Sequence, residues 1–334
     1  MGKKKIVFAG HDLKFASIII EYFRRNKEFE VEIDQWAGHN SHNEEHSLKC
    51  VEWADIVVCE WGLGNAVWYS QNKKPNQVLI VRMHLQEKDT QYPRDFNLDN
   101  IDKIIAISPF VYEEFYRTFK FPREKMIMIY NVVDTIKLDL PKINEASFNL
   151  GIIGICPSRK RLDLAIDLLE KLWHKDRRYK LYIKGKLPQE YTWLWKKEEE
   201  REYYEAVFKR IENAPWKKSV IFDGFGSDIE EWFTKIGFIL STSDFESFHL
   251  SPSEGMASGA YPLILNWDGS DTIYEKIYLC EDIDQCTKKI AEVNIHEDNV
   301  STPLKRYVKE KFGAEKITSD WFNLIQELLN SKKH

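Results

Sequence analysis

The segment FILSTSDFESFHLSPSEGMASGAYPLIL, residues 238–265, decides the fold class of this chain. Its two ends, Phe238–Ser241 and Pro262–Leu265, are short apolar runs without polar alternation, as is typical of strands that are buried on both faces of a parallel sheet. A polar turn and a helical stretch connect the two runs. Because parallel strands need such a crossover, the segment predicts a right-handed βαβ unit and therefore an α/β protein.

The same alternation of apolar runs and helical segments extends over the rest of the chain, in two series. The strands predicted for the first series are Lys5–Ala9, Val31–Trp36, Asp55–Glu60, Val78–Arg82, Lys103–Ser108 and Met126–Tyr130. The second series comprises Phe148–Ile155, Leu181–Lys184, Val220–Phe222, Phe238–Ser241 and Pro262–Leu265. Helical segments such as Lys14–Arg25 and Val111–Phe119 lie between the strands. The pattern predicts two Rossmann-like, doubly wound α/β domains.

A polar connection without clear periodicity, Asp134–Ser147, separates the two series. We therefore predict an N-terminal domain over residues 1–140 and a second domain over residues 147–312. Residues 313–334 form a final helix, whose apolar side between Ile317 and Leu329 is expected to pack back on the first domain. Ligands of open α/β sheets bind at the carboxyl ends of the strands. We expect the chemistry on the loops there, facing a central cleft between the two domains.

The composition excludes several classes of protein. The 334 residues include 48 Lys and Arg against 53 Asp and Glu, a formal net charge of −5, whereas nucleic-acid binding needs a basic excess or stripe. No apolar run approaches the ~18 residues of a membrane span, and the run Ile6–Ala9 is too short for an export signal. The five cysteines are scattered, without a C-x-x-C pair. A reduced protein of the cytoplasm is the expectation.

The segment Pro188–Lys218 combines aromatic and charged residues. Trp193 and Trp195 precede a run of lysines and glutamates. Aromatic side chains beside lysines are compatible with contact to a membrane surface or a large acceptor. A salt-bridged, exposed helix with aromatic anchors in the domain explains the same pattern, and we favour this second interpretation.

Two glutamates eight positions apart, Glu246 and Glu254, flank the turn in the opening segment. The turn leads into a helix, and the backbone N–H groups of residues 248–251 would point out of the helix start and favour an anion such as a phosphate. The structural alternative is a capping box in Ser251–Glu254, with proline at the first helical position and the glutamate reaching back to the cap. That alternative leaves Glu246 unexplained. A carboxylate that accepts hydroxyl hydrogen bonds beside a phosphate site suits a sugar joined to phosphates.

The spacing Glu246-x7-Glu254, followed by Gly-Met-Ala-Ser-Gly at residues 255–259, resembles the E-x7-E signature of the family 4 (group 1) retaining glycosyltransferases, which have the GT-B fold. The resemblance covers the whole chain in outline and is most specific in the second domain. It implies that Glu246 contacts the donor sugar and that Glu254 holds the nucleotide ribose. It also implies that the turn amides of Phe248, His249 and Leu250 bind the diphosphate. No cofactor and no essential metal are implied, because the nucleotide sugar is a substrate.

Three consecutive cations, Arg159, Lys160 and Arg161, follow the strand that opens the second series. Such a cluster suits a diphosphate, because charge-assisted hydrogen bonds offset the charge that develops on a leaving nucleoside diphosphate. Cations at a helix N-terminus also oppose the macrodipole unless an anion binds there. In the family this loop carries an Arg directly after the glycine and a Lys five residues on. Lys160 matches the Lys, whereas Ile155 stands at the Arg position. Either Arg159 or Arg161 supplies the missing charge, or binding is weaker than the family suggests.

The first domain offers weaker candidates at the ends of its predicted strands. His84 follows the strand Val78–Arg82 and matches a cleft histidine that touches the donor sugar in the family. The resemblance therefore assigns His84 a catalytic, donor-orienting role. A pocket for the sugar or the acceptor is expected from residues on the neighbouring loops: Gly10, His11, Asp12, Arg82 and Asn65. Local capping is the competing explanation for Asp12.

Two patterns that spell metal sites are not interpreted as such. His39, His42 and His46 lie in a polar loop without a cysteine or a fixed helical frame. Asp282 and Asp284 spell the D-x-D of metal-dependent glycosyltransferases, but they lie late in the chain among acidic neighbours. We predict no metal site.

The resemblance predicts a retaining transfer of a sugar from a nucleotide-diphosphate donor to a hydroxyl of a glycan or lipid-linked glycan, in envelope polysaccharide synthesis. The expected partners are the nucleotide sugar and that acceptor, without nucleic acid. Peripheral contact with the inner face of the membrane and the oligomeric state are left open. A nucleotide-sugar epimerase and an inactive GT-B subunit that binds a partner enzyme are the alternatives. A dehydrogenase is disfavoured, because no G-x-G-x-x-G opens either half.

Overall fold

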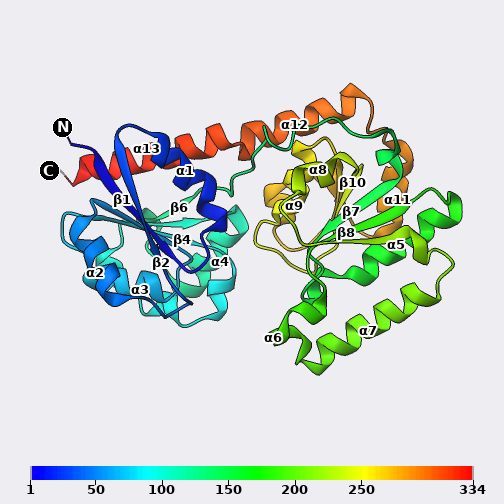
Figure 1. The fold of residues 1–334 in the computed structure, drawn as a ribbon. Helices are drawn as coiled ribbons and strands as arrows, with labels where there is room; N and C mark the ends of the chain where they lie inside the picture. The colour runs from blue at the N-terminus through cyan, green and yellow to red at the C-terminus, as the bar shows by residue number, and fades with distance from the viewer. Residues whose placement is uncertain (1, 333–334) are drawn as a thin grey trace. The chain divides into compact units, whose positions relative to one another are not determined.

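The computed structural model describes residues 2–332, which divide into two compact α/β units (Figure 1). One unit comprises the chain up to Val132 together with the segment from Ala314 onward, and the other runs from Val133 to Gly313. Each unit contains one six-stranded sheet, and all paired strands within the sheets are parallel. The predicted fold class is confirmed. The boundary lies before the polar connection and not within it, because Val133 pairs with Gly313.

The sheet of the first unit has the strand order β2-β1-β3-β4-β5-β6. Its strands are β1 (Lys4–Gly10), β2 (Phe29–Gln35), β3 (Ile56–Glu60), β4 (Val78–Met83), β5 (Lys103–Ala106) and β6 (Met126–Met128). Its helices are α1 (Ser17–Arg25), α2 (Glu44–Trp53), α3 (Gly64–Asn72), α4 (Pro109–Phe119) and α13 (Ala314–Ser331). The strand order changes direction at β1, which pairs with both β2 and β3. The loops after β1 and β3 therefore flank the switch point of this sheet.

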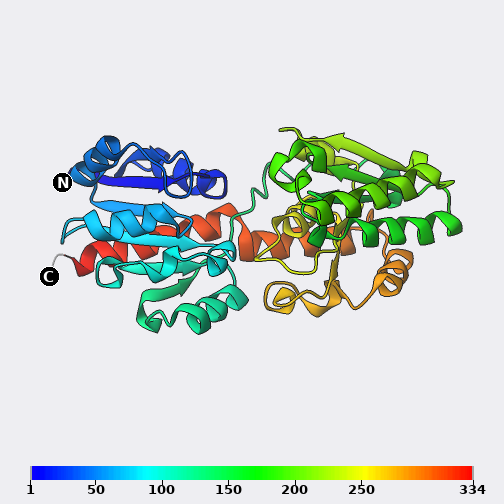
Figure 2. The same cartoon turned by 90° about the horizontal axis from the view of Figure 1, so that it is seen from below.

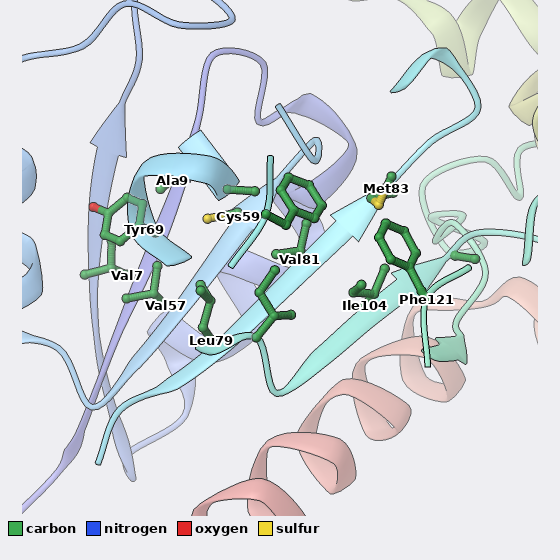
Figure 3. Close-up of a cluster of buried hydrophobic side chains, with 14 of the residues drawn as sticks. Val7, Ala9, Val57, Cys59, Tyr69, Leu79, Val81, Met83, Ile104 and Phe121 are labelled. Carbon is green, nitrogen blue, oxygen red and sulfur yellow. The ribbon is translucent and has the colours of Figure 1, made fainter. Parts of the chain in front are cut away.

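The sheet of the first unit separates two apolar cores. Val7 and Ala9 of β1 belong to the core in Figure 3, whereas Ile6 and Phe8 belong to the core on the opposite face, since side chains alternate along a strand. Helix α13 contributes to the second core through its buried apolar residues: Ile317, Trp321, Leu324, Ile325, Leu328 and Leu329. The final helix thus completes the core of the first unit, although the whole second unit separates it in sequence from β6.

The sheet of the second unit has the order β12-β11-β10-β7-β8-β9, with helices alongside (Figure 2). Its strands are β7 (Asn149–Ile153), β8 (Lys180–Lys184), β9 (Val220–Gly224), β10 (Phe238–Ser241), β11 (Tyr261–Leu265) and β12 (Leu279–Cys280). Its helices are α5 (Leu162–Lys175), α6 (Thr192–Trp195), α7 (Glu198–Asn213), α8 (Ile229–Thr234), α9 (Leu250–Ala257), α10 (Ser270–Ile273), α11 (Ile283–Glu292) and α12 (Asp298–Phe312). The strand order changes direction between β7 and β10, which makes their carboxyl ends the switch point.

Two features of the second unit bear on the sequence analysis. Strand β12 was not predicted, because two residues at a sheet edge carry no recognisable apolar run. The charged segment 188–218 contains α6 and α7, and Arg210 of α7 pairs with Asp167 and Glu170 of α5, both at 2.6 Å. Tyr204 of α7 is fully buried. The interpretation as a salt-bridged helix is confirmed, with Tyr204 as the aromatic anchor, whereas Trp193 is exposed. Between residues 2 and 332, no helix is both long enough and apolar enough to cross a bilayer.

Candidate active site

The loops after β7 and β10 form the candidate site of the second unit. Because β7 and β10 pair in parallel at the switch point, their carboxyl ends and the loops that follow lie side by side. Two hydrogen bonds join the loops. The amide of Asp244 donates to the carbonyl of Arg159 at 2.8 Å, and Oγ1 of Thr242 donates to the carbonyl of Lys160 at 2.8 Å. These hydrogen bonds hold the loop with Arg159 and Lys160 against the loop with Glu246.

The carboxylate of Glu246 is the centre of this site, and its side chain is almost completely buried. Its Oε1 contacts the ammonium group of Lys160 and accepts a hydrogen bond from the Ser243 hydroxyl at 2.7 Å. The Arg159 guanidinium lies 3.5 Å from the same oxygen. Burial by itself would raise the pKa of Glu246, but the positive charges of Lys160 and Arg159 lower it to about 2. Glu246 is therefore ionised at neutral pH.

The three predicted cations differ in their partners. Arg159 also donates to the carbonyl of Phe245 at 2.7 Å and covers the ring of that residue. Arg161 instead pairs with Asp163 at 2.8 Å and Asp244 at 2.9 Å. Ile155, at the position of the family's arginine, is buried and brings no charge. Of the two candidates for the missing charge, Arg159 is the one that lies beside the glutamate.

His249 begins the turn into α9 with a left-handed backbone, φ 54°. Its Nδ1 lies 2.6 Å from Oγ of Ser241, and its Nε2 lies 2.9 Å from Oγ of Ser251. Trp267 donates to the same Ser241 oxygen at 3.1 Å. Burial lowers the pKa of His249 to about 3, so the ring is neutral. The imidazole thus holds the first turn of α9 to the end of β10.

The capping-box alternative for residues 251–254 is wrong. Helix α9 begins at Leu250, so Ser251 and Pro252 lie inside it, and the hydroxyl of Ser253 donates back to the carbonyl of Leu250 at 2.8 Å. No side chain caps the helix. The left-handed His249 turns the chain into the helix earlier than the proline suggests. Glu254 therefore has no capping role, and burial raises its pKa to about 7.

A buried polar cluster lies at the carboxyl ends of β3 and β4 in the first unit. Nη1 of Arg82 donates to both oxygens of Glu60 at 3.0 and 3.1 Å, and Nη2 donates to Asn131 at 2.5 Å. Nε2 of His84 lies 3.0 Å from Oε1 of Glu60. Burial would raise the pKa of Glu60, but Arg82 and His84 lower it, and burial lowers the pKa of His84. His84 is 3% exposed, and its donor-orienting role stays a prediction.

Arg82 and Asn65 were expected to line a pocket for the sugar or the acceptor, and this role stays a prediction. Both side chains are buried and bind groups inside the unit. Nδ2 of Asn65 donates to the carbonyls of Ala9 at 2.9 Å and Glu60 at 3.0 Å, which joins the ends of β1 and β3. A Cβ on Gly10 would lie 2.7 Å from the Glu60 carbonyl oxygen, so close approach explains that glycine.

Sequence reasoning missed the importance of Glu60 and Ser243, both of which bind predicted site residues. For Glu60 a signal was present. Arg82 lies in an otherwise apolar strand, and a buried arginine requires a buried acid on a neighbouring strand. β3 ends in one. For Ser243, nothing in its sequence context distinguishes it from the other serines of its loop.

The loop after β1 carries His11 and Asp12. The ring of His11 lies 4.7 Å from that of His39 and 6.1 Å from that of Trp61. The carboxylate of Asp12 accepts the amide of Lys14 at 3.1 Å, and its carbonyl accepts Nε1 of Trp61 at 3.0 Å. The carboxylate of Asp12 thus closes a local turn, but it caps neither α1 nor the 3-10 turn Lys14–Ala16 before it, whose N-cap is Leu13. The partly exposed rings of His11, His39 and Trp61 gather at the switch point of the sheet.

Within residues 2–332, no group of three or more His, Cys, Asp and Glu side chains is arranged to hold a metal ion. His42 instead stacks on Trp36 with ring centroids 3.9 Å apart. Asp282 caps α11, and Asp284 pairs with Lys171 at 2.5 Å. These residues have structural partners of their own.

Comparisons with known proteins connect the second unit to one family. The model of the glycosyl transferases group 1 family matches residues 141–278. The poly(ribitol-phosphate) alpha-N-acetylglucosaminyltransferase of Staphylococcus aureus (strain COL) is 23% identical over 287 residues, which cover 81% of this chain and 55% of that protein. The chain thus spans about half the length of this curated relative.

Solved structures share the fold over nearly the whole chain. A glycosyltransferase from Rickettsia africae ESF-5 has a TM-score of 0.72 at 15% identity and covers 98% of this chain and 99% of its own. Anabaena HepE, solved in complex with UDP and glucose, has a TM-score of 0.70 at 15% identity, covering 97% of this chain and all of its own. The chain therefore has the GT-B fold of these glycosyltransferases.

Proposed function

We propose that this protein is a retaining family 4 glycosyltransferase. It transfers a sugar from a nucleotide-diphosphate donor to a hydroxyl of a glycan or lipid-linked glycan in envelope polysaccharide synthesis. The observation that carries the proposal is the contact between Lys160 and Glu246 at the switch point, beside the start of α9. A cation, an ionised carboxylate and the first amides of a helix together supply phosphate binding and hydroxyl binding.

In this proposal the diphosphate binds to Lys160, Arg159 and the amides of residues 248–250. These groups stabilise the negative charge that develops on the leaving diphosphate. They take the part that a divalent cation has in metal-dependent transferases, which makes the reaction independent of metal. The matched family model over residues 141–278 supports this assignment of the donor to the second unit.

Glu246 and Glu254 bind the hydroxyl groups of the donor in this proposal. Lys160, Ser243 and Arg159 all approach Oε1 of Glu246, so Oε2 serves as the acceptor for sugar hydroxyls. Glu254 binds the ribose. The acceptor hydroxyl attacks the anomeric carbon from the face that the diphosphate leaves, and a phosphate oxygen takes its proton. The new bond joins the anomeric carbon to the acceptor oxygen with retained configuration, and positioning supplies much of the rate.

The similar proteins support a proposal for the donor and acceptor classes. Because HepE was solved with UDP and glucose, and the Staphylococcus relative is named as an N-acetylglucosaminyltransferase, we propose a UDP-hexose or UDP-N-acetylhexosamine donor. The acceptor binds the loops around His11 and Trp61, whose rings offer stacking surfaces for sugars. We place the enzyme in the cytoplasm.

Two measurements test this function. UDP, GDP and ADP are added separately to the protein, and we expect UDP to raise the melting temperature, as any ligand that binds only the folded state does. A panel of nucleotide sugars is then screened for hydrolysis and for transfer to envelope glycans. A protein whose melting temperature no nucleoside diphosphate changes would instead be the inactive subunit, an alternative that the uncharged Ile155 favours.

A further inference from the structure

Helix α7, which the proposed function does not use, is hydrogen-bonded to the loop that carries Lys160. The carboxylate of Glu200 accepts the amide of Ser158 at 2.8 Å and the hydroxyl of Ser158 at 2.9 Å. The Tyr204 hydroxyl donates to the carbonyl of Ile155 at 2.6 Å. Glu200 and Tyr204 lie one turn apart on α7. They therefore hold the loop at Ser158 and at Ile155.

Tyr203, the third contact, holds the far end of the same loop. Its hydroxyl donates to Oδ1 of Asp163 at 2.7 Å and accepts the amide of Asp163 at 3.1 Å. Asp163 is also the partner of Arg161, and hydrogen bonds from Arg161 and Tyr203 lower the pKa of Asp163 against the effect of burial. The loop from Ile155 to Asp163 is thus held by α7 at its start, its middle and its end.

We propose that Glu200 is a positioning residue that holds the 3-10 turn Ser158–Lys160 in the conformation in which Lys160 reaches the phosphate site. The inference rests on the proposed function, since it assigns Lys160 to a diphosphate. The turn is closed by the amide of Lys160, which donates to the carbonyl of Pro157 at 2.9 Å. Its first N–H, that of Ser158, lacks a partner within the turn, and the carboxylate of Glu200 supplies one.

The charges of the loop favour an acidic side chain at Ser158. Arg159, Lys160 and Arg161 are adjacent in sequence and carry like charges that repel one another. Acidic partners in the site pair with these cations, and the carboxylate of Glu200 adds a negative charge at the first amide of the turn. A loop that is ordered before the ligand binds loses less conformational entropy on binding.

The helix itself offers a matched control. Glu199 and Glu200 are neighbours on α7, but Glu199 is exposed whereas Glu200 is partly buried against Ser158. The two glutamates have the same charge and helix propensity. A comparison of Glu199→Ala with Glu200→Ala therefore separates the contact to the loop from the loss of a negative charge on α7.

The experiment measures the affinity for UDP by titration calorimetry in wild type, Glu199→Ala, Glu200→Ala and Glu200→Gln. We expect Glu200→Ala to weaken UDP binding roughly two- to tenfold, as expected when an ordered segment becomes mobile. Glu199→Ala should bind as the wild type does. Glu200→Gln keeps one acceptor oxygen for Ser158 and should recover part of the loss.

A double-mutant cycle separates positioning from direct contact. If Glu200 acts through Lys160, then Glu200→Ala should have little further effect on UDP affinity in a Lys160→Ala background. The positioning role is overturned if Glu200→Ala lowers the UDP affinity equally in the wild-type and the Lys160→Ala background. It is also overturned if the single variant Glu200→Ala binds UDP as tightly as the wild type. A wild type that binds none of UDP, GDP and ADP overturns the proposed function.

Hydrogen exchange in the ligand-free protein distinguishes these failures. The amides of residues 158–161 should exchange faster in Glu200→Ala than in wild type and Glu199→Ala. Faster exchange in Glu200→Ala, together with no nucleotide binding by the wild type, supports the positioning role of Glu200 and rejects the proposed function. Unchanged exchange of these amides rejects the positioning role of Glu200, whether or not a nucleotide binds.

Discussion

The ammonium group of Lys160 contacts the carboxylate of Glu246, although the two residues stand 86 positions apart in the chain. They meet because β7 and β10 are neighbours in the sheet, and each residue lies on the loop that follows its strand. The cation proposed for the phosphate is therefore paired with the acid proposed for the sugar. Nucleotide binding must exchange this contact for one with the diphosphate.

Removal of the Lys160 ammonium should weaken nucleotide binding most among the three loop cations. We expect Lys160→Ala to reduce the affinity for UDP by roughly 10-fold or more, the effect of one charge-assisted hydrogen bond. Arg159→Ala should have a smaller effect, and Arg161→Ala the smallest, because Arg161 pairs with Asp163 and Asp244. Titration calorimetry with UDP ranks the three variants. A larger effect for Arg159→Ala would show that the loop is aligned with the family one residue out of register.

Neutralisation of Glu246 should separate turnover from nucleotide binding. Glu246→Gln should reduce sugar transfer by roughly 10- to 100-fold, because a charged acceptor for the sugar hydroxyls is lost. UDP affinity should stay the same or rise, since Lys160 is released from its ion pair. Initial-rate kinetics and calorimetry with UDP measure the two effects, and an unchanged melting temperature serves as the control for folding. Unchanged turnover would remove Glu246 from the site.

The raised pKa of Glu254 makes stability depend on pH in a defined window. Burial raises this pKa to about 7 in the folded protein, against an ordinary value of 4.5. The folded state therefore binds the proton more tightly than the unfolded state does. The stability that this proton contributes is lost as the pH rises from about 4.5 to about 7. The free energy of unfolding of the wild type should fall over this window more than that of Glu254→Gln. Urea denaturation at about pH 5 and about pH 8 compares the two slopes, and equal slopes would contradict the buried carboxyl.

Helix α13 should be essential to the stability of the first unit. Trp321 is 1% exposed in the core that α13 shares with β1, so Trp321→Ala should lower the free energy of unfolding by about 3–5 kcal/mol. Phe322, which is only partly buried beside the same core, provides a milder control. Chemical denaturation measures both variants. If Trp321→Ala lowered the free energy of unfolding less than Phe322→Ala does, α13 would not unfold cooperatively with the first unit.

The core strands and the second-unit candidates could be predicted from sequence because their signals are local. Apolar runs such as Phe238–Ser241 mark buried strands wherever they lie, and the spacing of Glu246 and Glu254 identifies a turn before a helix. The prediction was weaker where a residue's environment depends on distant partners. Arg82 was expected in a pocket, but it is buried against Glu60 of the neighbouring strand.

The sequence by itself determined the two parallel α/β units and the presence of cations and acids on loops after strands, since both follow from residue type and periodicity. Only the tertiary structure decided which cation reaches Glu246, that Glu254 does not cap α9, and that α7 braces the cationic loop. These outcomes depend on strand order and on left-handed backbone at Arg161 and His249. Strand order joins segments far apart in the chain, and a single left-handed residue redirects the side chains that follow it, so neither can be derived from local pattern alone.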